Sequence, residues 1–198
     1  VDILIAGGGY APFSLPLEEF AKAAHPLGVP VYPCINLGAT EFVSEGSYLE
    51  AVRALATNWY EMGADGIYLW NLATSFQNES SPNLIATRDK YYSCLEEIGD
   101  PQALECKDKL FCVDNGRSGV LLYYAHVSSP PPLPLTSKRG AIQQGVVQRV
   151  PLRVDDDLEA AARNNRLREL RLMIKIRGPA PKEGLVFRLN GEILTGEE

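Results

Sequence analysis

Residues 59–71 have the sequence Trp59-Tyr60-Glu61-Met62-Gly63-Ala64-Asp65-Gly66-Ile67-Tyr68-Leu69-Trp70-Asn71. Its first residues end an amphipathic helix predicted over 47–62, which begins with the capping-box pattern Ser47-x-x-Glu50. Gly63 is a residue type that stops helices, as is Gly28 after the preceding predicted helix. The short apolar run Asp65–Asn71 then predicts a buried strand. The same alternation continues in both directions, with strands predicted over Asp2–Gly7 and Val29–Asn36 and helices over Leu15–Pro26 and Pro82–Ile98. Repeated strand and helix units predict a parallel sheet.

The three predicted strands are short and almost continuously apolar, which is typical of strands buried on both faces. A closed eightfold barrel takes about 250 residues. We therefore interpret residues 1–128 as the last three βα units, with a trailing segment, of a (β/α)8 TIM barrel of the α/β class. Val1 begins a strand without a basic leader, so we expect the chain to start within a fold. The sequence does not determine the cellular compartment, and it is compatible with a secreted or periplasmic location.

The second half of the chain has a different pattern. Pro130–Pro134 is typical of an extended linker. Beyond it, three stretches alternate apolar and polar residues and predict antiparallel strands, and Asn190-Gly191 predicts a type I′ hairpin turn within the last of them. We expect residues 129–198 to form a small β-sandwich-like domain, with a short helix over Leu158–Arg166. The three stretches are Val146–Val154, Leu167–Ile176 and Leu185–Leu194.

Composition excludes several classes of function. The net charge of −6 is unfavourable for nucleic-acid binding, which needs a basic surface. No apolar run reaches the roughly 18–20 residues of a membrane-spanning helix. The four cysteines and two histidines show no zinc-ligand spacing, so we expect buried or half-buried thiols and no metal. No motif calls for a cofactor.

In a barrel, ligands bind where strands end at their carboxyl edge. A sugar site typically has an aromatic ring that packs against the C–H face of a pyranose. Amide groups beside the ring form hydrogen bonds with the sugar hydroxyls. The predicted carbohydrate-binding residues at these strand ends are Gly8, Gly9, Tyr10, Asn36, Trp70 and Asn71. Hydrolysis of a glycosidic bond needs two carboxyl groups. No acid follows the strands directly, so the candidates are Glu41 and Glu45 in the loop after the second strand.

The loops after the predicted strands also suggest two other classes of ligand, a dinucleotide and a phosphate or flavin. Gly7-Gly8-Gly9-Tyr10-Ala11-Pro12 partly matches a dinucleotide-binding turn, but proline occupies the third small position and no acid ends the next strand. A phosphate- or flavin-binding barrel would want glycine-rich loops after its last strands. Asn36-Leu37-Gly38-Ala39 fits this pattern in part, whereas Asn71-Leu72-Ala73-Thr74 has no glycine.

The quoted residues resemble the last units of bacterial family-10-like glycosyl hydrolase barrels. The likeness rests on Tyr48–Arg53, Trp59–Asn71, Gly7–Gly9 and Val31–Asn36, and in the tail on Asp155–Leu158 and Arg188–Gly191. It implies a fragment of a carbohydrate-active hydrolase of O-glycosidic bonds, inactive alone, with an appended β-domain. The strand that would end in a catalytic glutamate carries Cys34 and Asn36 instead. The alternative is therefore a non-catalytic carbohydrate-binding or surface protein.

Overall fold

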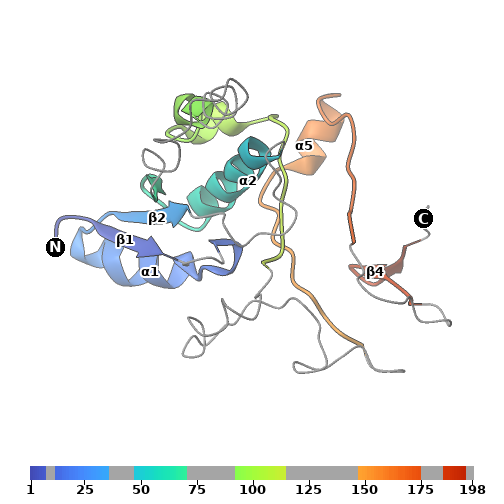
Figure 1. The fold of residues 1–198 in the computed structure, drawn as a ribbon, viewed down its shortest axis with the longest axis horizontal. Coiled ribbons are helices and arrows are strands. Elements are labelled where there is room, and N and C mark those ends of the chain that lie inside the picture. Colours follow the sequence, from blue (N-terminus) through green and yellow to red (C-terminus); the bar gives the residue numbers. More distant parts are fainter. Residues whose placement is uncertain (8–11, 36–46, 71–91, 115–146, 175–184, 195–198) are drawn as a thin grey trace, which may run out of the picture.

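The computed structural model describes residues 1–7, 12–35, 47–70, 92–114, 147–174 and 185–194. Its longer helices are α1 (Leu17–Ala24), α2 (Tyr48–Glu61) and α5 (Leu158–Arg163), shown in Figure 1. Short 3-10 turns cover Pro12–Ser14 (η1), His25–Leu27 (η2), Ser93–Glu96 (η3) and Pro101–Leu104 (η4). The strands are β1 (Leu4–Gly7), β2 (Val31–Ile35), β3 (Tyr68–Leu69), β4 (Arg188–Leu189) and β5 (Glu192–Ile193).

The first three strands form one parallel sheet in the order β1-β2-β3. Leu4 of β1 lies opposite Val31 of β2, and Cys34 of β2 lies opposite Tyr68 of β3. Each connection between strands contains a helix, as parallel pairing requires. The predicted parallel sheet and its first two helices are confirmed, with ends shifted by a few residues. Of the helix predicted over 82–98, the structure describes only residues 92–98, which contain η3.

The structure shows that the predicted TIM barrel is wrong. β1 and β3 are the edges of the sheet, and neither edge pairs with a further strand in the described part of the chain. Ile3 and Ile5 are 47% and 51% exposed, although in a closed barrel they would fill the interior. The apolar run of the first strand reflects burial of one face only, because Leu4 and Ala6 point to the helices instead. The observed fold is α/β, with a three-stranded parallel sheet and a separate two-stranded antiparallel sheet.

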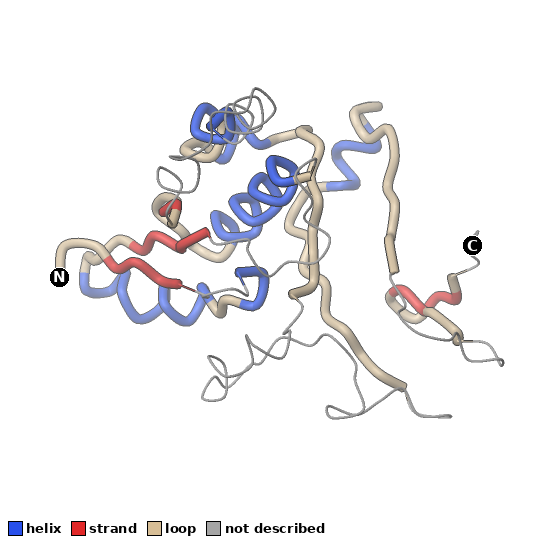
Figure 2. Tube along the Cα trace, viewed as in Figure 1, coloured by secondary structure: helices blue, strands red, loops and turns tan. Residues whose placement is uncertain are grey.

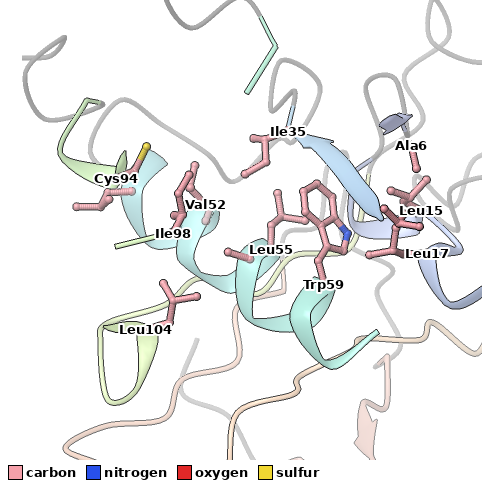
Figure 3. Packing of buried hydrophobic residues seen from close by; sticks show 14 of the residues in the cluster. Ala6, Leu15, Leu17, Ile35, Val52, Leu55, Trp59, Cys94, Ile98 and Leu104 are labelled. Carbon is pink, nitrogen blue, oxygen red and sulfur yellow. The ribbon is translucent and has the colours of Figure 1, made fainter. Parts of the chain in front are cut away.

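The core lies between this sheet and α2. Figure 3 shows the indole of Trp59 between Leu55 of the same helix and Leu17 of α1, below β2. Ala6 of β1 and Ile35 of β2 close the cluster from the sheet side. Both helices therefore cover the same face of the sheet. The opposite face is the one that displays Ile3 and Ile5.

Glycines end the helices as predicted, whereas the predicted capping box does not form. Gly28 and Gly63 have φ of 69° and 97°, the left-handed conformation that stops a helix. Ser47 makes no side-chain capping bond at the start of α2. Asp65, three residues before β3, accepts a hydrogen bond of 2.7 Å from the backbone N–H of Val31. This bond, aided by His25 at 2.9 Å, lowers the pKa of the Asp65 carboxyl and fixes the start of β3 beside β2.

The C-terminal segment confirms the predicted hairpin and helix but not the other strands. Asn190 and Gly191 both have positive φ, 51° and 96°, as a type I′ turn requires between β4 and β5. Helix α5 begins after Asp157, whose carboxylate accepts a hydrogen bond from the Ala160 amide. In contrast, residues 147–155 and 165–174 contain no strand. The proposed division at residues 128 and 129 stays a prediction.

Two contacts hold the segment before α5 against the first half of the chain. The buried Asn58 side chain of α2 donates to the Arg153 carbonyl at 3.2 Å and accepts from the Asp155 amide at 3.1 Å. Lys109 Nζ contacts both carboxylate oxygens of Asp156, at 2.7 and 2.9 Å. Figure 2 shows that the β4–β5 hairpin lies well away from the parallel sheet. The 147–157 segment therefore packs on α2, and the hairpin does not.

Candidate functional site

Most of the predicted site residues lie outside the described residues. Trp70 is the one sugar-binding candidate that the structure describes. Because the sheet is parallel, the C-terminal ends of β1, β2 and β3 lie at the same end of the sheet, as the prediction required. The positions that stay untested are Gly8, Gly9, Tyr10, Asn36, Glu41, Glu45 and Asn71.

Three aromatic residues lie on the face of the sheet opposite α1 and α2, and we call Tyr32, Tyr68 and Trp70 the aromatic face. Residues of paired strands that lie opposite each other share a face, and alternate residues along a strand share it too. Cys34 lies opposite Tyr68, which places Tyr32 on the face of Tyr68. The Trp70 N–H donates to the Ile35 carbonyl at 3.2 Å, so the ladder continues one residue past β3. Alternation then directs Trp70 to the same side.

The aromatic face is accessible and rests on a packed layer. Tyr68 is 37% exposed and Trp70 is 53% exposed, whereas Tyr32 is half-buried. Apolar side chains that lie together and exposed on one face are candidates for a binding surface. The intervening residues Ile35 and Leu69 pack into the core under α2. A ligand on the aromatic face would therefore meet side chains fixed by strand geometry.

Gly66 allows the ring of Tyr32 to lie close to the backbone that leads into β3. A Cβ atom at Gly66 would lie 3.0 Å from Cζ and 3.1 Å from Cε1 of this ring. These separations are below ordinary van der Waals contact, so one group would have to move. The glycine thus sets the position of Tyr32 on the aromatic face.

We expect Gly66→Ala to displace the Tyr32 ring while the fold survives. The half-buried ring can turn outward, so the expected loss of stability is about 1 kcal/mol. Nuclear Overhauser contacts between Tyr32 and residue 66 would measure the displacement, with Gly99→Ala as the control because nothing lies within 4 Å of a Cβ there. Unchanged contacts between Tyr32 and residue 66 would contradict this packing.

Cys34 lies in the same face but offers no reactive thiolate. Desolvation by burial raises the pKa of its thiol, and a hydrogen bond from the Trp70 backbone N–H opposes this only in part. A thiol with a raised pKa is protonated near neutral pH and is a poor nucleophile. Cys94 and Cys112 are also buried, as predicted, whereas Cys106 is exposed. The aromatic face is therefore suited to binding by contact rather than to covalent chemistry.

A buried carboxyl group, Asp114, lies beside the segment that follows β1. Its Oδ2 accepts a hydrogen bond of 2.6 Å from the Ser14 amide, and the Phe13 amide and Ser14 hydroxyl also donate to this group. Its Oδ1 is buried without a partner, and the residue is 1% exposed. Desolvation raises the pKa of Asp114 to about 7, against the opposing effect of its hydrogen bonds. No sequence motif marked this residue, since its partner is 100 positions away.

The described residues contain neither a metal-ligand cluster nor a helix that could cross a bilayer. No group of three or more His, Cys, Asp or Glu side chains gathers in them. None of their helices combines the length and the apolar character that a membrane span needs. Within the same residues, Asp114 is the one carboxyl group whose pKa is raised.

Comparison with protein-family models and with curated proteins found no match to this chain. The resemblance to glycosyl hydrolase-like proteins therefore stays a prediction from the quoted residues.

Proposed function

We propose that this protein binds carbohydrate, and that the aromatic face is the binding surface. The observation that carries the proposal is the exposure of Trp70 and Tyr68 on one side of a strand whose other side is anchored in the core. Pyranose rings present a flat array of C–H bonds, and an aromatic ring provides the matching apolar surface. The tyrosine hydroxyls add donors and acceptors for the sugar hydroxyls.

The geometry supports binding more than hydrolysis. Asp114 has the raised pKa of a general acid, but hydrolysis needs a second carboxyl group at a defined separation. A protein that binds sugar without turnover needs only the aromatic surface and nearby polar groups. The neighbours in sequence, Asn36 after β2 and Asn71 after Trp70, carry suitable amides. The non-catalytic alternative is therefore the one we propose.

The first experiment measures the affinity of the full chain for a panel of soluble oligosaccharides by isothermal titration calorimetry. For the best ligand, we expect Trp70→Ala to weaken binding about tenfold, which corresponds to about 1.4 kcal/mol. Tyr68→Ala should weaken it by a smaller factor, because this ring is less exposed. The matched control is Leu27→Ala, which removes an exposed apolar side chain of η2, outside the aromatic face.

Equal affinity of Trp70→Ala and the parent chain would contradict the proposed surface. Failure of the folded parent to bind any saccharide of the panel would contradict the proposed function itself. Each mixture is also assayed for new reducing ends. Their release would show turnover and would favour the hydrolase over the binding protein.

A further inference from the structure

Asp114 connects two segments that are far apart in the sequence. Its own segment follows η4, and its partners Phe13 and Ser14 belong to η1, which lies between β1 and α1. We call these three residues the Asp114 tether. The donors on η1 are amides and a hydroxyl, so they bring no positive charge to the carboxyl group.

In the tether, the carboxyl group of Asp114 is buried, and its charged form has too few hydrogen-bond partners. One oxygen accepts the bonds from η1, and the other is buried with none. Removing an unpaired carboxylate from water is costly, and a protein relieves this cost by protonation or by opening the site to water. The neutral acid keeps the bond from Ser14 and avoids the buried charge.

The titratable neighbour of Asp114 in the described residues is the thiol of Cys112, on the same segment. This thiol is buried, and desolvation with the nearby Asp114 charge raises its pKa to about 12. It is therefore neutral throughout the range in which Asp114 titrates. On the η1 side, Pro12, Phe13 and Ser14 carry no titratable group. Among the described residues around the tether, Asp114 is thus the group that changes charge in this range.

We propose that the Asp114 tether is a proton-operated latch that holds η1 while Asp114 is neutral and releases η1 when Asp114 loses its proton to solvent. Release lets water reach the carboxylate and separates η1 from the segment that follows η4. The raised pKa of about 7 sets the midpoint near neutral pH. The latch is a property of the chain alone and does not depend on the proposed sugar.

The sign of the linked stability follows from the raised pKa. In the unfolded chain the carboxyl group titrates near 3.8, whereas in the folded chain it titrates near 7. Between these values the folded state binds the extra proton, so its contribution to stability falls as the pH rises. The contribution is complete below about pH 4 and is lost as the pH passes about 7.

The experiment compares the full chain with Asp114→Asn, which keeps an acceptor oxygen but cannot ionise. Hydrogen exchange, corrected for intrinsic rates, is measured for the Ser14 amide at pH 5.5 and pH 8.5. We expect protection in the parent to fall about tenfold at the higher pH, and protection in the variant to stay constant. Asp108→Asn, an exposed aspartate on the same segment, is the control and should behave as the parent.

Carboxyl carbon chemical shifts of the parent give a second measurement that does not depend on any variant. A titration midpoint for Asp114 near 7 is expected. A midpoint near 4 would overturn the latch, because the carboxylate would then be charged in the folded site at neutral pH. If protection of the Ser14 amide fell as much in Asp114→Asn as in the parent between pH 5.5 and pH 8.5, the latch would be overturned as well. The loss of protection would then not depend on the ionisation of Asp114.

Discussion

Trp59→Ala is expected to lower the free energy of unfolding by about 3–5 kcal/mol, the range measured for large aromatic residues truncated in cores. Trp59 is 1% exposed and is the largest fully buried side chain of the described residues. Its indole joins α2 to α1, so truncation leaves a cavity that neither helix can close alone (Figure 3). A domain of ordinary stability has about 5–15 kcal/mol in total. Urea unfolding followed by far-ultraviolet circular dichroism measures the loss.

The chain contains a matched control for this substitution. The same change at the only other tryptophan, Trp70→Ala, removes a side chain that is half exposed. We expect it to change the unfolding free energy by less than about 1 kcal/mol. Similar losses in both variants would show that Trp59 does not have the central position assigned to it.

Asp156→Ala is expected to destabilise the protein by about 3–5 kcal/mol, because it leaves a buried ammonium group without its partner. The side chain of Lys109 is 2% exposed, and its Nζ contacts both oxygens of Asp156. The contact also joins the segment before α5 to the one that follows η4. Loss of this pair should therefore release Asp156 from the segment that follows η4 and loosen residues 147–157. Proteolysis within that segment measures the release, and urea unfolding measures the energy.

The control is an ion pair of the same charge type on the surface. Glu159 and Arg163 of α5 are separated by 3.6 Å and are both largely exposed. Glu159→Ala should cost no more than about 0.5 kcal/mol. The double variant Lys109→Met with Asp156→Leu should recover most of the lost stability, since an apolar pair needs no compensation of charge. A large loss in the double variant would contradict this explanation.

The sequence predicted local elements better than it predicted their assembly. Gly28 and Gly63 marked helix ends, and Asn190-Gly191 marked a hairpin turn, because each position needs a positive φ. Such signals involve few residues and no distant partner. The helical spacing over 47–62 likewise gave α2 within one residue at each end. Ser47 was misassigned because a capping-box pattern does not show whether the side chain faces the helix.

The barrel was predicted wrongly because an apolar strand does not reveal how many of its faces are covered. Ile3 and Ile5 are as apolar as Leu4, yet only Leu4 faces the helices. Alternation predicted strands over 146–154 and 167–176 as well, but a strand needs a partner, and residues 147–155 and 165–174 are not paired in the structure. Alternation of apolar and polar residues describes the conformational preference of one segment. Strand pairing also depends on a second segment that can form the hydrogen bonds.

The candidate site shows the same limit. Trp70 was predicted because it ends a recognisable strand; the structure shows that it is exposed, and its binding role stays a prediction. Tyr68 and Tyr32 were overlooked because their common face follows from the register between strands, which no single segment contains. Asp114 was overlooked because only folding brings it to Ser14. Residues that only folding brings together, across 30 or more positions, leave little trace in local spacing.

Two-dimensional 15N–1H spectra of the indole groups, recorded during a saccharide titration, test the aromatic face most directly. The chain has two tryptophans, of which Trp59 is buried and Trp70 is exposed. We predict that the Trp70 indole signal shifts with the added ligand and saturates, while the Trp59 signal stays in place. A ligand that binds without moving the Trp70 signal would contradict the proposed surface.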